Sequence, residues 1–307
     1  PVPWGRSTAD EPYLETLVAA GLLPEITDPA HLEWIASGSD AEPRPPSCYV
    51  VSLARLHERR FGVPAGRFVR ALCHHYEVEL HHFAPNAISQ EVVFVAICEG
   101  YQGIQAHWDL WRHLFRGELY TESISQGVRR PVRAGGLTLH LRGSRKDLYI
   151  SCTMTSNNRE WDQRWFYLWN DGGRLPAYTG RVLTEKPNAC GYRVSPLERQ
   201  ARLKVYTDAL QRLAGKGLTA AIVIANFHRR RVLPLMERKL PLFQMTGDAP
   251  YEGTRMVEEF LSDGVSAQRA GRAVSQPPSD LADYWRVSMR PEAGYIQVVS
   301  FVSRLRH

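Results

Sequence analysis

Residues 84–101 form the segment that most restricts how this chain can fold. Within it Ile88, Val92 and Val95 recur at helical spacing, and other apolar residues between them leave almost no polar face. Asn86 is the expected N-cap, because a short polar side chain there can accept a backbone N–H. A helix that is hydrophobic all round is normally surrounded by other elements. We therefore expect the remaining chain to pack around this helix.

The segments on either side of this helix carry helical patterns of their own. The patterns are joined by short connections, which favours a compact bundle of four or more helices over residues 48–119. An acidic helical lobe and a Pro-rich linker, residues 1–47, precede the bundle. The other helices expected up to residue 119 lie at 11–23, at 28–36, from about 52 to 60, after Pro64, and at 106–116.

The apolar pattern changes from helical to alternating after the bundle. Residues 137–141 and 148–153 alternate between apolar and polar side chains, and the four residues 143–146 between them suit a turn. The aromatic run 165–169 is the expected third strand. The sequence therefore predicts a small antiparallel sheet over residues 136–170, packed on the bundle.

Helical patterns return at residues 195–239, where two apolar helices, from 195 to about 215 and over 220–227, precede a basic and then apolar segment at 229–238. These helices complete a core that we place at residues 48–245, followed by a tail at 246–307. The fold class predicted from these patterns is α+β, mainly α. It is a helical bundle with a small antiparallel sheet inserted between an N-terminal and a C-terminal helical part.

The charge of the chain permits binding to nucleic acid without requiring it. The formal net charge is +6 and the pI is near 9.1, while residues 1–50 hold eight acids against two arginines, so the positive excess lies after residue 50. Five widely spaced cysteines favour reduced thiols in the cytoplasm or nucleus. No stretch approaches the roughly 20 apolar residues of a membrane span, so we expect no membrane partner. Because the first residue is Pro1, we expect a fragment or a processed product.

The densest group of titratable side chains lies at residues 73–82, with the sequence CHHYEVELHH. Cysteine and histidine can bind metals, but none of these pairs has the spacing of a structural zinc site. The alternative is a helix end whose histidines lie near the negative end of the helix dipole. We favour the helix end, and we predict no metal and no cofactor.

The sequence contains none of the common catalytic motifs that bind phosphates, dinucleotides or catalytic zinc, or that present a nucleophile. Asp109, Asp147, Glu160 and Asp162 could gather around a metal for phosphoryl transfer. Carboxylates beside arginines are more often surface ion pairs. We therefore predict no catalytic residues and no enzymatic activity.

Two groups of basic residues are the candidate nucleic-acid contacts. The first surrounds the expected hairpin and the second opens the segment 229–238. Aromatic residues near the first group could stack on bases, or they could fill the core while the arginines solvate its rim. The candidate contacts are Arg129, Arg130, Arg133, Arg142, Arg145 and Lys146 in the first group, and Arg229, Arg230 and Arg231 in the second. The aromatic residues are Tyr149, Trp161, Trp165, Phe166, Tyr167 and Trp169.

One long block resembles a known family. Residues 61–90, FGVPAGRFVRALCHHYEVELHHFAPNAISQ, look like the gypsy-type transposon domain of plant retroelement proteins. Segments similar to its other blocks follow in the expected order, and the likeness spans about residues 1–245. They are PVPWGRST at 1–8, LVAAGLL at 17–23, WDLWRHLF at 108–115, WFYL at 165–168 and RRRVLPLMER at 229–238.

The resemblance implies an origin in a mobile element and leaves the biochemical role open. We expect a non-enzymatic structural or nucleic-acid-associated module of a plant gypsy-type retrotransposon protein, Gag-like or adjacent to that region. It would associate with itself and contact RNA or DNA. One alternative is a transposase-like, metal-dependent enzyme. Another is a protein-interaction scaffold whose aromatic seam, Trp108 to Phe115, is exposed.

Overall fold

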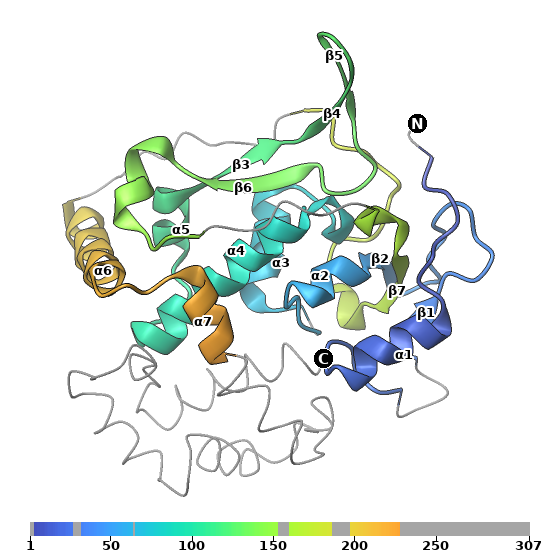
Figure 1. Ribbon diagram of the computed structural model, residues 1–307, viewed down its shortest axis with the longest axis horizontal. Coiled ribbons are helices and arrows are strands. Elements are labelled where there is room, and N and C mark those ends of the chain that lie inside the picture. The colour runs from blue at the N-terminus through green and yellow to red at the C-terminus, as the bar shows by residue number, and fades with distance from the viewer. Residues whose placement is uncertain (1–2, 27–31, 64, 153–159, 186–196, 228–307) are drawn as a thin grey trace, which may run out of the picture.

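The computed structural model describes residues 3–26, 32–63, 65–152, 160–185 and 197–227 (Figure 1). At its centre lies α4 (Pro85–Ala96), which continues as the π-helical turn η2 (Ile97–Tyr101). Every residue from Glu91 to Tyr101 is buried. The predicted helix that other elements surround is therefore confirmed. Its N-cap is Ala84, with Pro85 in the first position, and not Asn86.

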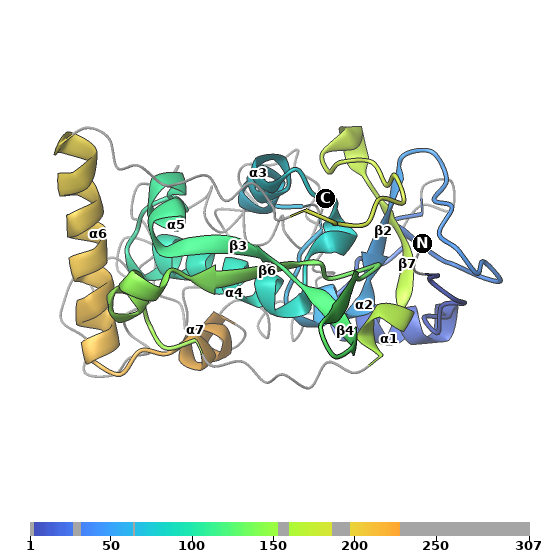
Figure 2. The same ribbon diagram turned by 90° about the horizontal axis from the view of Figure 1, so that it is seen from above.

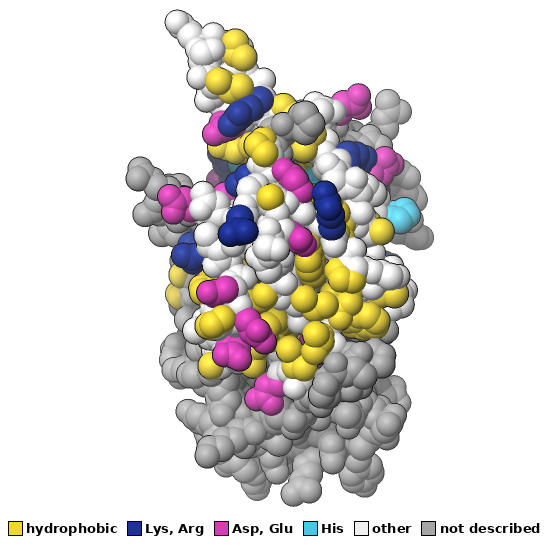
Figure 3. Space-filling view, turned by 90° about the vertical axis from the view of Figure 1, so that its right-hand side faces the viewer, with side chains coloured by type: hydrophobic (Ala, Val, Ile, Leu, Met, Phe, Trp, Pro, Cys, Tyr) yellow, Lys and Arg dark blue, Asp and Glu magenta, His cyan; other side chains and the backbone are white. Residues whose placement is uncertain are grey.

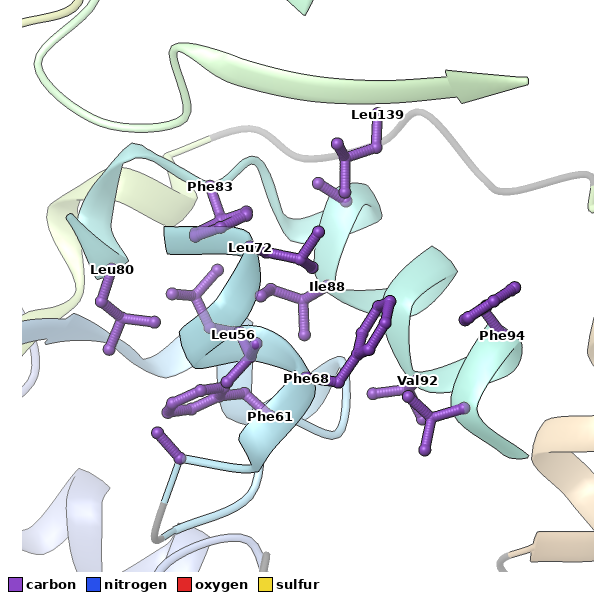
Figure 4. Packing of buried hydrophobic residues seen from close by; sticks show 14 of the residues in the cluster. Leu56, Phe61, Phe68, Leu72, Leu80, Phe83, Ile88, Val92, Phe94 and Leu139 are labelled. Carbon is purple, nitrogen blue, oxygen red and sulfur yellow. The ribbon is translucent and has the colours of Figure 1, made fainter. Parts of the chain in front are cut away.

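Aromatic and aliphatic side chains from several elements pack on α4 (Figure 4). The ring of Phe94 lies 5.3 Å from that of Phe68 and 5.1 Å from that of Trp111, measured between centroids. Leu139 approaches from the opposite side, from a strand that crosses above the helix. Burial of such large side chains is the main favourable contribution to folding.

The other helices are short, except one. The predicted helices after Pro64 and at 195–215 and 220–227 are confirmed as α3, α6 and α7, whereas residues 229–238 lie outside the described residues. The α-helices besides α4 are α1 (Glu11–Ala19), α2 (Ala54–Glu58), α3 (Arg67–Tyr76), α5 (Trp108–Leu114), α6 (Leu197–Gly215) and α7 (Ala220–Phe227). The 3₁₀ helices are η1 (Leu80–His82), η3 (Gly143–Leu148), η4 (Trp161–Gln163) and η5 (Asp171–Gly173).

One sheet of three antiparallel strands has the order β1-β7-β2. Its middle strand is β7 (Trp165–Trp169), the predicted aromatic strand. Its neighbours are β1 (Trp34–Ala36), which lies where we expected the helix at 28–36, and β2 (Tyr49–Leu53), which precedes the helix expected from about 52 to 60 and overlaps only its first residues. Both are short apolar runs, and periodicity cannot tell a buried strand from a helix over so few residues.

A long antiparallel ribbon is formed by the chain between α5 and η3. Its base pairs β3 (Phe115–Leu119) with β6 (Leu137–Leu141), and its tip pairs β4 (Thr121–Ser125) with β5 (Val128–Pro131). The backbone N–H of Tyr120 donates to the carbonyl of Gly136 between the two parts (2.8 Å). Seen from above, the base runs over α4 (Figure 2). We call residues 120–131 the arm, because they project from the body (Figure 1).

The predicted fold class is wrong in its arrangement of strands. The expected hairpin between 137–141 and 148–153 does not form, because β6 pairs with β3 and the expected turn belongs to η3. The described residues contain several small antiparallel sheets, and they do not form a helical bundle with a single inserted sheet. Strand pairing joins segments far apart in the sequence, so local patterns identified β6 and β7 but not their partners.

Candidate nucleic-acid interface

Four arginines gather where α5, β3 and η3 meet. We call this group the basic cluster, and it comprises Arg112, Arg116, Arg142 and Arg145. Lys146 follows Arg145 on η3 and is exposed. Arg116 is exposed, and the other three arginines are half-buried.

Local structure fixes the position of this cluster. Because α5 runs directly into β3, Arg112 and Arg116 lie on either side of the helix end. The strand β6 returns along β3, and its last register pair, Phe115 with Leu141, sets Arg142 beside the end of α5. The backbone N–H of Arg142 donates to the carbonyl of Leu114 (2.8 Å), and its Nε donates to the carbonyl of Arg112 (3.0 Å).

The charges in the cluster repel one another. Burial is the largest cause that lowers the pKa of Arg142. The positive charges of Arg116, Arg112 and Arg145 lower it further, whereas Tyr76 raises it. Burial also lowers the pKa of His113, with Arg145 and Arg142 contributing. Such mutual repulsion is relieved when an anion approaches, so the cluster is suited to binding phosphate groups.

Glu118 and two aromatic rings accompany the cluster. Glu118 forms an ion pair with Arg116 (2.5 Å between Oε1 and Nη2), which offsets part of the positive charge. Trp108 lies one helical turn before Arg112 on α5 and is half-buried. Its ring meets that of His75 edge-on, with centroids 4.9 Å apart. The surface therefore offers both cations for phosphates and partly exposed rings for a base.

Comparison with known proteins assigns the middle of the chain to a family. Residues 50–118 match the family described as a putative gypsy type transposon. This match confirms the resemblance seen in the sequence over that part of the chain, and it marks the protein as retroelement-related. No curated protein and no solved structure matches the chain.

The gypsy-type segment, residues 50–118, includes the central helix α4 and half of the basic cluster. Arg112 and Arg116 lie within the segment, whereas Arg142 and Arg145 come from the chain that follows it. We did not identify Arg112 and Arg116 as candidates from the sequence. The four-residue spacing of Arg112 and Arg116 around a helix end could have indicated that they lie close together. The pairing of β3 with β6 that brings them to Arg142 joins distant segments, so the sequence did not reveal it.

The structure distributes the first predicted group over three places. Arg142, Arg145 and Lys146 lie at the basic cluster. Arg129 and Arg130 lie on the arm, where Arg130 forms an ion pair with Glu122 (2.7 Å). The second predicted group, Arg229, Arg230 and Arg231, lies outside the described residues.

Arg133, the remaining member of the first group, is engaged inside the protein. Its Nη2 lies 2.8 Å from Oδ2 of Asp162, and its Nη1 donates to the carbonyls of Pro3 and Trp4. The guanidinium carbon also lies 5.9 Å from the ring centre of Trp4, which is buried. Arg133 therefore holds the N-terminal segment against the body.

Most of the aromatic residues near the predicted basic group fill the core. Tyr149, Trp165, Phe166 and Tyr167 are buried, and only Trp161 and Trp169 are half-buried. The packing interpretation thus holds for the first four. Most of the seam from Trp108 to Phe115 is also covered, since Trp111, Leu114 and Phe115 are buried, whereas Trp108 is half-buried. The scaffold alternative thus loses most of the exposed aromatic surface on which it depended.

The histidines of residues 73–82 separate into two environments. His74 and His75 occupy the last turn of α3, as the helix-end interpretation expected. His81 and His82 are buried in η1. The backbone N–H of Glu79 donates to Nδ1 of His82 (3.0 Å), so Nε2 carries the proton and donates to the carbonyl of Arg181 (2.7 Å).

Nothing in the described ranges resembles a metal centre. No group of three histidine, cysteine, aspartate or glutamate side chains there could hold an ion. Of the four carboxylates considered for catalysis, Asp162 is bound to Arg133. None of the described helices has the length and apolarity that crossing a membrane requires.

Proposed function

We propose that this chain is a non-enzymatic, nucleic-acid-associated structural module of a plant gypsy-type retrotransposon protein, Gag-like or adjacent to the Gag region. The basic cluster is the observation that carries the proposal. It combines four mutually repelling arginines with the partly exposed rings of Trp108 and His75. The family match supports the retroelement setting.

The ligand we propose is single-stranded RNA or DNA of the element. Cations that track a phosphate backbone and rings that can stack on a base are the features that single-strand binding uses. Half of the cluster lies inside the gypsy-type segment, so binding would belong to the matched domain together with the ribbon that follows it.

Fluorescence anisotropy with a labelled single-stranded RNA, titrated at several NaCl concentrations, tests this function. We expect affinity to fall steeply with salt, because binding releases counterions from the phosphates. The triple variant Arg116→Gln, Arg145→Gln, Lys146→Gln should bind at least about tenfold more weakly, and its log–log salt slope should be shallower by about 2.

A charge-matched triple variant provides the control. Arg6→Gln, Arg44→Gln and Arg67→Gln remove the same charge from exposed positions that we do not assign to the cluster. This variant should keep most of the affinity and the slope. Equal losses in both variants would show a nonspecific charge effect, and no measurable binding at low salt would refute the proposal.

The transposase-like alternative has no candidate metal site among the described residues. Incubation of the full chain with labelled DNA and Mg²⁺ or Mn²⁺ tests the non-enzymatic part of the proposal. We expect the DNA to remain intact. Cleavage or strand transfer that copurifies with the protein and is abolished by chelation would contradict it.

A further inference from the structure

Two histidines lie at the edges of the basic cluster, on different helices. His75 is half-buried in the last turn of α3, and its ring meets that of Trp108 edge-on, with centroids 4.9 Å apart. His113 is buried in the last turn of α5. Histidine is the side chain whose ordinary pKa lies closest to neutral pH, so both residues can change charge where the cluster would hold phosphates.

Hydrogen bonds hold two arginines of the cluster close to His113. Arg142 donates its backbone N–H to the carbonyl of Leu114 (2.8 Å) and its Nε to the carbonyl of Arg112 (3.0 Å), the two residues that flank His113. The backbone N–H of Arg145 donates in turn to the carbonyl of Arg142 (2.8 Å). Burial lowers the pKa of His113, and the charges of Arg145 and Arg142 lower it further.

His75 has a similar environment that is built from two helices. Arg112 lies one helical turn after Trp108 on α5, so its charge is near the imidazole that Trp108 contacts. His74, the preceding residue on α3, is exposed. Burial lowers the pKa of His75, and the charges of Arg112 and His74 lower it further. Both histidines of the cluster are therefore mainly neutral at pH 7 in the free protein.

Acids on the surrounding elements leave the cations in excess. Glu118 on β3 pairs with Arg116 (2.5 Å), and Asp208 on α6, which packs against α5 and η3, pairs with Lys204 (2.8 Å). Glu91 on α4, which packs against α3, acts on Cys73. Further charged or titratable groups on these elements are Asp109 on α5, His140 on β6, Lys146 and Asp147 on η3, and Arg202 and Arg212 on α6.

We propose that RNA or DNA binding at the basic cluster is coupled to proton uptake by His75 and His113, so that acidification strengthens binding. This inference rests on the proposed function and adds a regulation of the same site. A phosphate held by the arginines offsets the positive charge that each imidazole meets, and a protonated imidazole attracts the phosphate in return. The coupling is reciprocal, because a ligand that favours proton binding is itself bound more tightly by the protonated protein.

The sign of the effect follows from the two states of the protein. In the free protein the pKa of each histidine lies below its ordinary value of about 6.5, and bound phosphate raises it. Affinity therefore rises as the pH falls from about 7.5 to about 5.5, and it levels off once the free protein is protonated as well.

The end of the molecule that carries α1 provides a contrast. It lies away from α5 in Figures 1 and 2, and acidic and basic side chains lie side by side on its surface (Figure 3). Asp10, Glu11 and Glu15 are exposed there. A phosphate that approaches this end meets carboxylates as well as cations, so we expect no comparable coupling there.

Fluorescence anisotropy of the full chain at constant ionic strength tests the proposal. The probe is single-stranded oligouridylate with a dye that does not titrate in this range, because uracil keeps its proton at these pH values. We expect the Kd to fall at least about fivefold between about pH 7.5 and 5.5, with a slope of at most about one decade per pH unit for each histidine. Circular dichroism at each pH confirms that the chain is folded.

Substitution of each histidine locates the effect. His75→Gln and His113→Gln should bind like the wild type at about pH 7.5, where both histidines are mainly neutral, and each should lose part of the gain at about pH 5.5. The control is His82→Gln on η1, whose polar contacts are Glu79 and Arg181 instead of the cluster. It should keep the full gain. An unchanged gain in both cluster variants would overturn the proposal.

Calorimetry of the wild-type chain counts the protons without any substitution that could disturb the fold. Titration with oligouridylate at about pH 6.5, in buffers of different ionisation enthalpy, should show uptake of at least about 0.3 proton per bound RNA. Salt-dependent binding without proton uptake would overturn this inference and leave the proposed function standing. Absence of RNA binding at every pH would overturn both.

Discussion

The base and the tip of the β3–β6 ribbon are built alike but lie in opposite environments. Phe115, Leu137 and Leu139 in the base are buried against α4 and its neighbours, and Phe115 meets Phe94 with ring centroids 5.9 Å apart. In the tip every residue from Glu122 to Arg130 is exposed. Both parts are pairs of short antiparallel strands. The comparison shows that burial follows both contact and sequence, because β6 (LTLHL) carries apolar side chains against the body, whereas β4 (TESIS) and β5 (VRRP) are mainly polar and project from it.

Close packing in the base depends on a small residue. At Gly117 a Cβ atom would come within 2.8 Å of Cε1 of Tyr76, so only glycine lets β3 lie this close to α3. The tip has no such constraint, since a Cβ at Gly127 would meet nothing within 4 Å, although the positive φ of 81° there still favours glycine in the turn. A pair of strands with no body to pack on is only marginally stable by itself.

The largest difference in stability between base and tip should come from substitutions that remove side-chain volume. Leu137→Ala opens a cavity in the core and should lower the free energy of unfolding by about 2–5 kcal/mol. Val128→Ala on the arm should change it by less than about 0.5 kcal/mol, because its side chain is already in solvent. Urea unfolding followed by circular dichroism measures both. Similar losses would mean that the arm is buried in solution, contrary to the structure.

Arginine substitutions should give the next largest contrast. Arg133→Gln removes the ion pair with Asp162 and the hydrogen bonds to Pro3 and Trp4, which should cost about 1–3 kcal/mol. Arg129→Gln on the arm, where the described part of the chain gives Arg129 no ion pair, should cost almost nothing. Unfolding free energies of the two variants provide the test. The tryptophan fluorescence should shift only in Arg133→Gln, because the guanidinium group over the Trp4 ring is then absent. Equal stabilities would remove the structural role assigned to Arg133.

Acidification should lower the free energy of unfolding of the body, which contains buried histidines. The arm contains no histidine and should not contribute to this change. Burial lowers the pKa of His82 to about 4, with the charge of Arg181 adding and its carbonyl opposing. The unfolded chain then binds the proton more readily than the folded chain, so stability falls as pH drops below about 6.5, by about 1.4 kcal/mol per unit from this group. Unfolding between about pH 7.5 and 5.5 measures it.

The neighbours of His82 define the control for this experiment. Burial lowers the pKa of His81 in the same direction, whereas burial raises the pKa of Glu79, which acts in the opposite sense at lower pH. His82→Gln keeps a donor for the Arg181 carbonyl but no longer titrates, so its stability should depend less on pH. An unchanged slope in His82→Gln would exclude His82 as the source.

Local patterns predicted the elements that are long or strongly periodic. The buried α4 and the helices α6 and α7 were visible in the sequence, because helical spacing over two or more turns is a local signal. The strands β6 and β7 were also visible as alternating and aromatic runs. The segment of β1 was assigned to a helix, because three apolar residues suit either structure, and β2, which precedes the helix expected from about 52, was not predicted as a strand.

The candidate site was predicted only in part, because local patterns do not show which distant segments meet. Arg142, Arg145 and Lys146 were named from the sequence, but Arg133 from the same run serves the fold. Arg112 and Arg116 join Arg142 only through the register of β3 on β6.

The sequence alone determined that a hydrophobic helix lies at the centre of this protein and that positive charge follows residue 50, because composition and helical period are local properties of the chain. The tertiary structure alone decided which arginines meet, which strands pair and why the arm is exposed. Those outcomes depend on contacts between distant segments, which local patterns do not record.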